Sequence, residues 1–405
     1  MSKQKQKRRQ CKSVEGRLRF VADHIDGFKI WLNGNGYRAT TIVEIVRLLA
    51  YWADWVQTAG FTFDTILAGF AASAAVFKGN KTIKAPLSAG TLFIRYLQEQ
   101  GTLPPPPTPP SPTETWPILG AFRAWMRDQR GVANSTLDTY QMTLVDLVKA
   151  LGDDPKAFTA HDVRAFVLNR AKQQSRGRAK SIATATRVFL RFLVATGQCP
   201  PEREYAIPPF ADWKLASIPR FLVADDVERA IAACGGESRL RDKAIILLLA
   251  RLGLRASEVS NLKLTDIDWK NGRLAITGKS RREEWLPLTQ EVGDAIVAYV
   301  EQARPRLPTS RLFITDLAPI RPVTRITVKC IVRRTLIRAG IKSDHQGAHV
   351  LRHSAATAML RKGVSLTGVG TVLRHRSLAM TMHYAKVDFG LLSEITQPWA
   401  GRLPC

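Results

Sequence analysis

The chain has 405 residues, of which 45% are hydrophobic, and it carries a formal net charge of +26 at neutral pH. That length predicts two or three domains with their own cores, and the composition excludes a disordered chain. The charge favours a polyanionic partner, nucleic acid before a membrane surface, and no apolar run approaches the ~18 residues that a membrane span needs.

Both the N-terminus and the cysteines indicate an intracellular protein. The opening sequence, MSKQKQKRRQCK, carries the charge of a signal peptide without the apolar segment that follows one, so we expect no export. The cysteines are scattered, odd in number and never spaced as C-x-x-C: Cys11, Cys199, Cys234, Cys330 and Cys405. This usage is typical of a reducing cytoplasm and predicts neither disulfides nor a cysteine zinc site.

Two stretches of the N-terminal half look alike. The first runs from FKIWLNGNGYRATT (28–41) to LFIRYLQEQGTLPP (92–105), and the second from FRAWMRDQRGVANST (122–136) to VFLRFLVATGQCPP (188–201). The matching positions are offset by 94 to 96 residues: Phe28 with Phe122, Trp31 with Trp125, Phe93 with Phe189, Arg95 with Arg191, and Gly101 with Gly197. We interpret them as two copies of one helical module, each beginning with an amphipathic helix and ending with a helix stopped by glycine and proline. Chance similarity between amphipathic helices is the alternative.

A proline-rich stretch, PPPPTPPSPT (104–113), separates the two copies. Consecutive prolines fix φ and remove amide donors, so we expect an extended polyproline II spacer; a ligand for a proline-binding domain is the alternative. The predicted boundaries are 1–103 for an N-terminal helical module, 104–115 for the linker, 116–205 for a second helical domain, and 206–405 for a third domain with a C-terminal tail.

Positive charge is spread over the whole chain, with +8 in residues 1–103, +5 in 104–219 and +13 in 220–405. A single charge run usually marks a solvated face, but an excess in every segment indicates a long surface that meets phosphates throughout. The densest patch of the second helical domain, NRAKQQSRGRAKS (169–181), supplies candidate contacts to a nucleic-acid backbone: Arg170, Lys172, Arg176, Arg178 and Lys180.

The third domain changes from helical to strand periodicity and back. LRDKAIILLLARLGLRASEVSNLKLTDIDW predicts a buried helix, a glycine break at Gly253 and a second helix capped near Ser257. TDIDWKNGRLAITGKSRREEWLPL then alternates apolar residues around an Asn271-Gly272 turn and a second turn at GKSRRE. We expect a three-stranded antiparallel meander with Lys279 at the tip of its second hairpin, and helices again from Val323 onward.

HVLRH (349–353) opens one of these helices and places His349, Arg352 and His353 on one face at i, i+3 and i+4. A histidine pair at i and i+4 can bind metal, but metalloprotease chemistry needs glutamate where Val350 stands, and Arg352 would repel a cation. We therefore expect no metal site; core or surface histidines are one interpretation and an anion site is the other. Taken alone, Arg255 has a surface ion pair as its alternative, and a lysine on a hairpin tip such as Lys279 is more often simply solvated.

Taken together, these side chains fit the chemistry of a phosphodiester. Two arginines can grip the non-bridging oxygens with planar donor forks and offset the charge that grows on them. A histidine can accept a nucleophile's proton, and a lysine on a hairpin tip can protonate the leaving oxygen. A tyrosine hydroxyl can form a covalent phosphoester, and Tyr384 follows Arg374 and His375 in VLRHRSLAMTMHYAKVD. The alternative for Tyr384 is an aromatic that fills the core side of a short helix.

These motifs resemble those of the tyrosine recombinases, or phage-type integrases, over about residues 116–400. GLRASEV is similar to the first arginine motif, TGKSRR to the hairpin-lysine motif, HVLRH to the H-x-x-R box, and LRHRSLAMTMHY to the final histidine–tyrosine box. The order of the motifs is also the family's. The departure is Arg374, because the family usually has glycine before the histidine; it bears on the local turn and not on the chemistry.

The resemblance implies a multidomain, mainly α fold with two helical DNA-binding modules. The first would be arm-like and the second a helical core-binding (SAM-like) domain, followed by an α+β catalytic domain with a small antiparallel three-stranded sheet. The implied catalytic residues are Arg255, Lys279, His349, Arg352, His375 and the nucleophile Tyr384, with Glu258 supporting Arg255 and with Arg281 and Arg282 as further DNA contacts.

The same resemblance implies a reaction and its partners. Tyr384 would form a 3′-phosphotyrosyl bond with duplex DNA and release a 5′-hydroxyl without ATP, metal or another cofactor, and four protomers would exchange strands through a Holliday junction. The expected role is integration, excision or transposition of a mobile element, in the cytoplasm and on the nucleoid, with accessory or sister recombinase proteins as further partners. A type IB topoisomerase and a non-catalytic basic DNA-binding protein are the alternatives.

Overall fold

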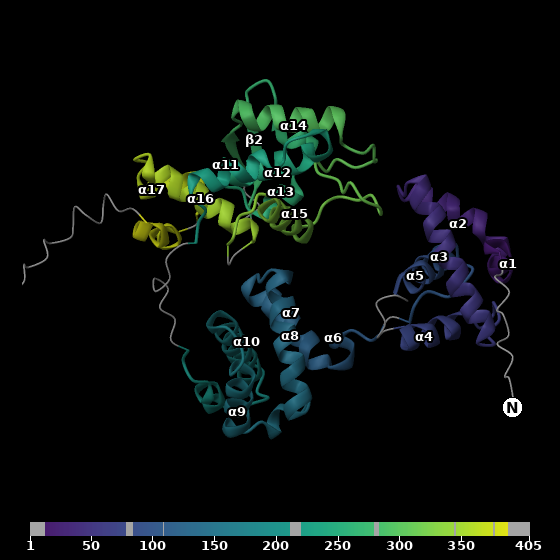
Figure 1. Ribbon diagram of the computed structural model, residues 1–405. Coiled ribbons are helices and arrows are strands. Elements are labelled where there is room, and N and C mark those ends of the chain that lie inside the picture. Colours follow the sequence, from purple (N-terminus) through teal and green to yellow (C-terminus); the bar gives the residue numbers. More distant parts are fainter. Residues whose placement is uncertain are drawn as a thin grey trace, which may run out of the picture. The chain divides into compact units, whose positions relative to one another are not determined.

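A computed structural model describes residues 13–77, 84–107, 109–210, 220–278, 283–343, 346–375 and 377–387. The chain divides into two compact units, one of residues 106–216 and one that combines 1–105 with 217–405. Within the second unit, the N-terminal helices and the C-terminal domain have separate hydrophobic cores. The prediction of a mainly α, multidomain chain with a small sheet is confirmed (Figure 1).

The N-terminal domain is a helical bundle around aromatic side chains. Its α-helices are α1 (Val14–Leu18), α2 (Ala22–Gly34), α3 (Ala39–Thr58), α4 (Ile66–Phe77) and α5 (Lys84–Glu99). Helix α3 forms because Ile45, Leu49, Trp52 and Val56 recur at helical spacing and are all buried. They pack on Phe93 and its neighbours from α5.

The second domain is another helical bundle. It contains α6 (Pro112–Thr115), α7 (Pro117–Arg130), α8 (Asn134–Leu151), α9 (Ala160–Ala171) and α10 (Arg176–Ala195). The short helix α6 occupies the end of the predicted proline linker, because Ser111 caps it and Glu114 completes a capping box. Helix α10 is the central element, with Phe189, Leu190 and Leu193 fully buried.

The two bundles contain the same cluster of four aromatic rings, which supports the interpretation as two copies of one module. In the first copy, Phe28 and Phe93 meet edge to face with centroids 5.2 Å apart at 85°. In the second, Phe122 and Phe189 meet at 5.4 Å and 85°. The outer ring pairs agree as well: Trp31 with Tyr96 at 6.1 Å and 55°, and Trp125 with Phe192 at 5.7 Å and 54°.

The copies differ at one close contact inside this cluster. Gly27 lies under the Tyr96 ring, and a Cβ placed on Gly27 would come 2.2 Å from the tyrosine hydroxyl oxygen. The positions that match by the same offsets are Ala121 and Phe192, where the alanine carries a Cβ and the ring has no hydroxyl. A glycine with a tyrosine in one copy therefore corresponds to an alanine with a phenylalanine in the other.

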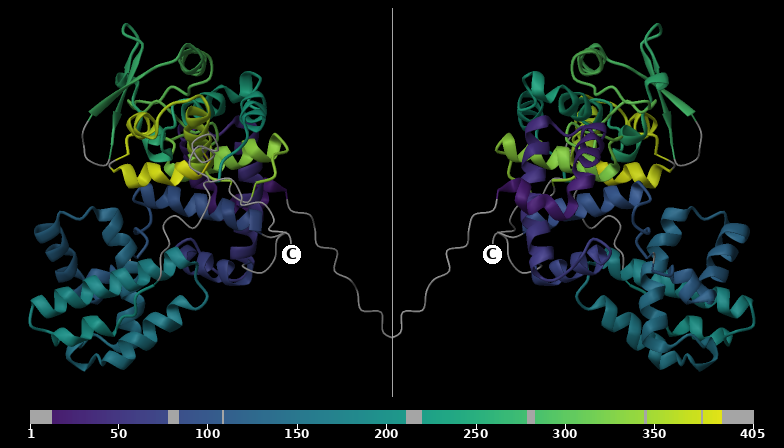
Figure 2. Two further views of the ribbon diagram at one scale, coloured as in Figure 1. Left: turned by 90° about the vertical axis from the view of Figure 1, so that its left-hand side faces the viewer. Right: turned by 90° about the vertical axis from the view of Figure 1, so that its right-hand side faces the viewer.

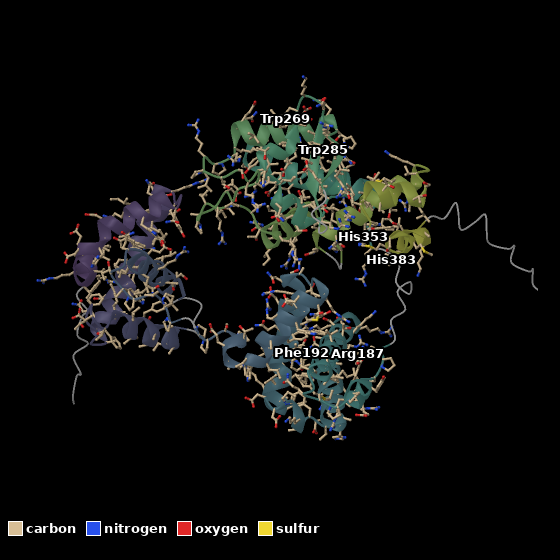
Figure 3. All side chains as sticks on the ribbon, turned by 180° about the vertical axis from the view of Figure 1, so that it is seen from behind. Arg187, Phe192, Trp269, Trp285, His353 and His383 are labelled. Atoms are coloured by element: carbon tan, nitrogen blue, oxygen red, sulfur yellow. The ribbon has the colours of Figure 1, made fainter. Side chains whose placement is uncertain are left out.

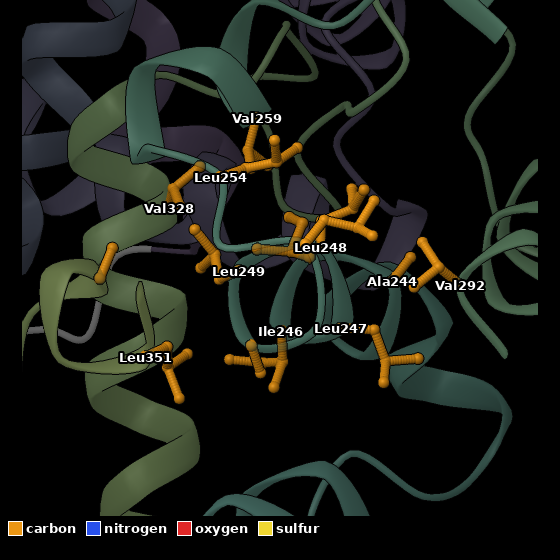
Figure 4. Packing of buried hydrophobic residues seen from close by; sticks show 14 of the residues in the cluster. Ala244, Ile246, Leu247, Leu248, Leu249, Leu254, Val259, Val292, Val328 and Leu351 are labelled. Atoms are coloured by element: carbon orange, nitrogen blue, oxygen red, sulfur yellow. The ribbon is translucent and has the colours of Figure 1, made fainter. Parts of the chain in front are cut away.

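The C-terminal domain is built around one helix that is buried on all sides. Its α-helices are α11 (Ala224–Ala232), α12 (Leu240–Ala250), α13 (Ala256–Asn261), α14 (Gln290–Gln302), α15 (Arg325–Arg338), α16 (Ala348–Arg361), α17 (Leu366–Val372) and α18 (Leu378–Thr381). Residues 245–249 of α12 have no exposed surface, and Figure 4 shows them surrounded by Val259, Val292, Val328 and Leu351 from four other helices. Each such side chain contributes about 1.5–3 kcal/mol when it is buried.

The sheet is the predicted antiparallel meander. Its strands are β1 (Ile267–Asp268), β2 (Arg273–Thr277) and β3 (Glu283–Pro287), in the order β1-β2-β3. Thr277 pairs with Glu283 at one end of the β2–β3 ladder, and Figure 2 shows β2 and β3 as green arrows at the edge of the helices of this domain. No helix of the described residues is long and apolar enough to cross a membrane.

Candidate active site

The loop between α12 and α13 positions Arg255. Gly253 has φ 61°, and a Cβ there would approach Leu373 to 2.6 Å, so glycine is required to turn the chain beside that residue. Arg255 is the N-cap of α13, and its Nη1 donates to Oε1 of Glu258 at 2.7 Å while its backbone N–H donates to Oε2 at 2.7 Å. The cap expected near Ser257 lies two residues earlier, at Arg255, whose backbone N–H donates to the Glu258 carboxylate.

The second arginine, Arg352, projects from α16 into the interior and is 3% exposed. Its guanidinium donates to the carbonyl oxygens of Gly253 and Leu373. Burial, together with the charge of Arg255, lowers the pKa of Arg352 to about 10, so it remains a cation at neutral pH. Two backbone carbonyl oxygens thus fix the direction of this buried cation.

The histidine of the last motif lies against the tyrosine. The His375 and Tyr384 rings are parallel within 6°, with centroids 6.1 Å apart. Nδ1 of His375 is 2.8 Å from Oγ1 of Thr381, a fully buried hydroxyl, and this contact fixes the ring orientation. Burial and the charges of Arg352 and Arg255 lower the pKa of His375 to about 4.

Tyr384 lies in the 3-10 helix η7 (Met382–Val387) and is 3% exposed. Its hydroxyl oxygen is 2.7 Å from Nδ1 of His353, which projects from α16 (Figure 3). Burial raises the pKa of Tyr384, while the positive charges of Arg352 and Arg255 act in the opposite direction. The hydroxyl is therefore protonated at neutral pH and close to a nitrogen that can exchange a proton with it.

His353 is the site residue that sequence reasoning missed. Its ring lies 5.4 Å from the Tyr384 ring and 6.4 Å from that of His383. Burial and the neighbouring histidines lower the pKa of His353 to about 4, so the imidazole is neutral at physiological pH. The sequence placed His353 on one helical face with His349 and Arg352 but gave it no role, because its contact with Tyr384 exists only in the folded chain.

His349 lies one turn earlier on α16, with its ring 6.2 Å from that of His353. Although its side chain reaches solvent, partial burial and the charges of Arg352 and Arg255 lower its pKa. It therefore faces the same cationic region as Tyr384. Among the predicted site residues, Arg255 is hydrogen-bonded to Glu258, the ring of His375 stacks on that of Tyr384, and Arg352 is hydrogen-bonded to the backbone of Gly253 and Leu373.

The remaining predicted site residues are of two kinds. Lys279, Arg281 and Arg282 lie outside the described residues, between the ends of β2 and β3. The five basic residues of the second domain gather where α9 ends and α10 begins, and all but the half-buried Arg178 are exposed. Arg170 pairs with Asp146.

In the described part of the chain, no group of three or more His, Cys, Asp or Glu side chains is placed to hold a metal ion.

Two family models and several known proteins are similar to this chain. The phage integrase family matches residues 220–390, and its N-terminal SAM-like domain matches residues 119–197. The protein y4rA of Sinorhizobium fredii, described as an integrase/recombinase, is 35% identical over 389 residues that cover 94% of this chain and 95% of that protein. Tyrosine recombinase XerC of Chlorobaculum parvum is 28% identical over 68% of this chain and 92% of its own length.

Solved structures share the fold at lower identity. XerH site-specific recombinase bound to its palindromic difH substrate has a TM-score of 0.55 at 20% identity, over 68% of this chain and 83% of that one. A lambda integrase dimer bound to a core site has a TM-score of 0.54 at 18% identity, over 66% and 94%. Family match, relatives and fold agree with the four motifs, and the chain belongs to the tyrosine recombinase family of DNA strand-transfer enzymes.

Proposed function

We propose that this protein is a site-specific recombinase that cleaves and rejoins duplex DNA through a 3′-phosphotyrosyl bond to Tyr384. The observation that carries the proposal is the surroundings of the Tyr384 hydroxyl. It lies 2.7 Å from a neutral histidine and close enough to Arg352 and Arg255 for their charges to oppose the rise in its pKa that burial causes. A phosphodiester needs both features, a proton acceptor for the nucleophile and cations for the non-bridging oxygens.

The steps conserve bonds and charge. Oη of Tyr384 attacks phosphorus as its proton passes to Nδ1 of His353, the other ring nitrogen of that histidine carrying the hydrogen. The bond from phosphorus to the 5′ oxygen breaks, and Lys279 protonates that oxygen. The phosphotyrosyl ester keeps the energy of the broken bond, so a 5′-hydroxyl from another strand can reverse the reaction. His349, at the edge of the same region, is placed to contact the phosphate together with Arg352.

The basic patch where α9 ends and α10 begins supports duplex DNA as the partner. Arg176, Arg178 and Lys180 occupy the first turns of α10, where the helix dipole disfavours cations. Phosphate groups would reverse that penalty, because they satisfy both the cations and the helix amides. We further propose that the N-terminal module, 1–103, contacts DNA as well, because it repeats the fold of the second domain and carries basic residues.

Assembly and biological role complete the proposal. Strand exchange requires paired sites and paired cleavages, so four protomers would act on two DNA duplexes through a Holliday junction. The similarity to integrase/recombinase y4rA and the basic N-terminal module favour integration, excision or transposition of a mobile element. The sequence of residues 388–405 carries an apolar set that we propose docks on a neighbouring protomer, with packing on its own domain as the alternative: Phe389, Leu391, Leu392, Ile395 and Trp399. These residues lie outside the described part of the chain.

Strand exchange at a defined site tests this function. We expect the protein to recombine two plasmids that each carry the DNA flanking its own gene, and to leave plasmids without that DNA unrecombined. Relaxation of any supercoiled plasmid without recombination would instead identify a topoisomerase. Tight binding with no covalent adduct on nicked suicide substrates would identify a non-catalytic DNA-binding protein.

His353 gives a second prediction. His353→Gln should slow adduct formation by about 10²-fold or more, because a positioned general base contributes 10²–10⁴ in rate. The acid limb of the wild-type pH–rate profile should lie near pH 4, since the pKa of His353 is lowered to about 4 and only the neutral ring can accept a proton. The measurement is single-turnover adduct formation between pH 4 and 8.

Two neighbouring histidines provide controls for His353. His383 lies near the Tyr384 ring, at 6.2 Å between centroids, so His383→Gln should react at close to the wild-type rate. His349→Gln should weaken the grip on the phosphate. If His349→Gln removes the acid limb while His353→Gln retains it, the proton acceptor is His349.

A further inference from the structure

Arg374, directly before His375, has a feature that the proposed reaction leaves unexplained. It is the one non-glycine residue of the described chain with a positive φ, at 55°. A left-handed backbone costs a residue with a Cβ about 1 kcal/mol or more. The side chain is nevertheless folded inward and only 6% exposed. Contacts of the guanidinium must therefore offset the backbone cost.

The guanidinium of Arg374 shares one carboxylate with Arg255. Its Nη2 lies 2.7 Å from Oε2 of Glu258, while Oε1 of Glu258 accepts from Arg255. Glu258 is itself only 5% exposed. Burial alone would raise the pKa of Glu258, but Arg374 and then Arg255 hold it below its ordinary value, so the carboxylate stays charged. Because Arg374 and Arg255 share the single negative charge of Glu258, that charge only partly neutralises Arg255, which can still attract a phosphate.

The backbone of the same turn contacts both phosphate-binding arginines. The carbonyl oxygen of Arg374 accepts from Nη2 of Arg255 at 3.4 Å, and that of Leu373 accepts from Arg352. The left-handed conformation of Arg374 is therefore part of the geometry that orients both guanidinium groups. Glycine could adopt this conformation without strain, but it could not pair with Glu258.

One atom of Arg374 has no hydrogen-bond partner. Its Nε is buried, and it lies 3.9 Å from Oε2 of Glu284 on β3, the strand that follows the Lys279 turn. A buried donor left without an acceptor is unfavourable by about 1–3 kcal/mol. A small inward movement of β3 would satisfy it. Arg374 is thus held by Glu258 on α13 and faces the strand that carries the hairpin.

We propose that Arg374 is a positioning residue for strand cleavage, which holds Glu258 in place and so sets the guanidinium of Arg255 against the scissile phosphate. The proposal rests on the proposed function, since it assigns Arg255 to the phosphate. It differs from a purely structural role in one respect: the chemical step should depend on Arg374 more than DNA binding does.

Three substitutions separate the side chain from the backbone. Arg374→Gly removes the guanidinium and the backbone strain together, Arg374→Gln removes the guanidinium and its charge but keeps the backbone strain, and Arg374→Lys keeps the charge with fewer donors. On a nicked suicide substrate, we expect Gly and Gln to slow adduct formation at saturating protein by about 10- to 100-fold, with DNA affinity within about threefold. Lysine should restore part of the rate. Adduct formation by Arg374→Gly at the wild-type rate would overturn the proposal.

Arg241→Gln is the matched control. Arg241 is as deeply buried, with its side chain 7% exposed, and it forms ion pairs with Asp242 at 2.7 Å and Asp316 at 2.8 Å. Its substitution should lower the melting temperature and leave the adduct rate of the folded protein unchanged. Equal effects of Arg241→Gln and Arg374→Gln on both quantities would reduce Arg374 to a structural ion pair and overturn the proposal.

A double-mutant cycle of folding stability tests the contact between Arg374 and Glu258 without any measurement of cleavage. Glu258→Gln should raise the unfolding equilibrium constant about tenfold less in Arg374→Gln than in the wild type, because the shared pair is already lost. Equal losses in the two backgrounds overturn the proposal. If the wild-type protein forms no adduct, the proposed function is contradicted instead. The stability cycle can still be interpreted in that case, because it does not depend on cleavage.

Discussion

Tyr384→Phe is expected to bind DNA with near wild-type affinity and to form no covalent adduct. The substitution removes one oxygen atom, and with it the nucleophile, so the rate should fall by at least about four orders of magnitude. The ring still packs on Ala356, Leu360 and Leu373, and the loss of one hydrogen bond with His353 costs about 1 kcal/mol of folding stability. The measurement is adduct formation on a nicked suicide substrate, separated on a denaturing gel.

Tyr299→Phe is the matched control for that experiment. Tyr299 is 1% exposed, and its hydroxyl accepts a hydrogen bond from the Ile314 backbone N–H at 3.0 Å. This substitution should lower stability by a similar amount and leave adduct formation intact. Adducts that persist in Tyr384→Phe would transfer the role of nucleophile to another side chain, with His383 the first to test.

Lys279→Ala should cleave ordinary DNA very slowly and recover most of its rate when the bridging 5′ oxygen is replaced by sulfur. An alkoxide is a poor leaving group because its conjugate acid ionises well above neutral pH, so its departure needs a proton in the transition state. A thiolate leaves without protonation. We expect a loss of about 10²–10⁴ on the oxygen substrate and a rate within about tenfold of wild type on the sulfur substrate.

The two arginines provide the contrast for Lys279. Arg255→Ala and Arg352→Ala each remove a positive charge that stabilises the non-bridging oxygens. Those oxygens need this stabilisation whether the leaving atom is oxygen or sulfur, so both variants should stay slow on both substrates. If sulfur fails to rescue Lys279→Ala, the proton comes from another group, and Arg281 and Arg282 are the next to replace.

Local patterns predicted the elements better than they predicted the contacts. The spacing in HVLRH placed Arg352 on a helix, and the change from period 3.6 to period 2 predicted the β1–β3 meander, because both signals reside within a few residues. The bond between His353 and Tyr384 joins residues 31 positions apart and depends on how α16 packs against η7. No short-range pattern contains that information.

Arg374 illustrates a second limit. An arginine before His375 predicts an altered turn, and the backbone is left-handed at this residue. The sequence does not reveal that the side chain turns inward to Glu258, 116 positions away, because an arginine in a loop is solvated more often than buried. The burial of Arg374 and its pairing with Glu258 depend on the tertiary packing of α13 against the turn that follows α17.

The glycine–tyrosine and alanine–phenylalanine pairs in the two aromatic clusters have a consequence for folding. Two bundles with the same core geometry on one chain could exchange their last helices, a failure typical of repeated domains. If α5 packed on α7, the Tyr96 hydroxyl would meet the Cβ of Ala121, at a position where the native contact already requires glycine. If α10 packed on α2, Trp31 would lose the acceptor that Glu99 gives its indole N–H at 2.8 Å, since Ala195 stands at the matching position. Each exchange is thus disfavoured, by a steric clash in one case and by the loss of a solvent-exposed hydrogen bond in the other.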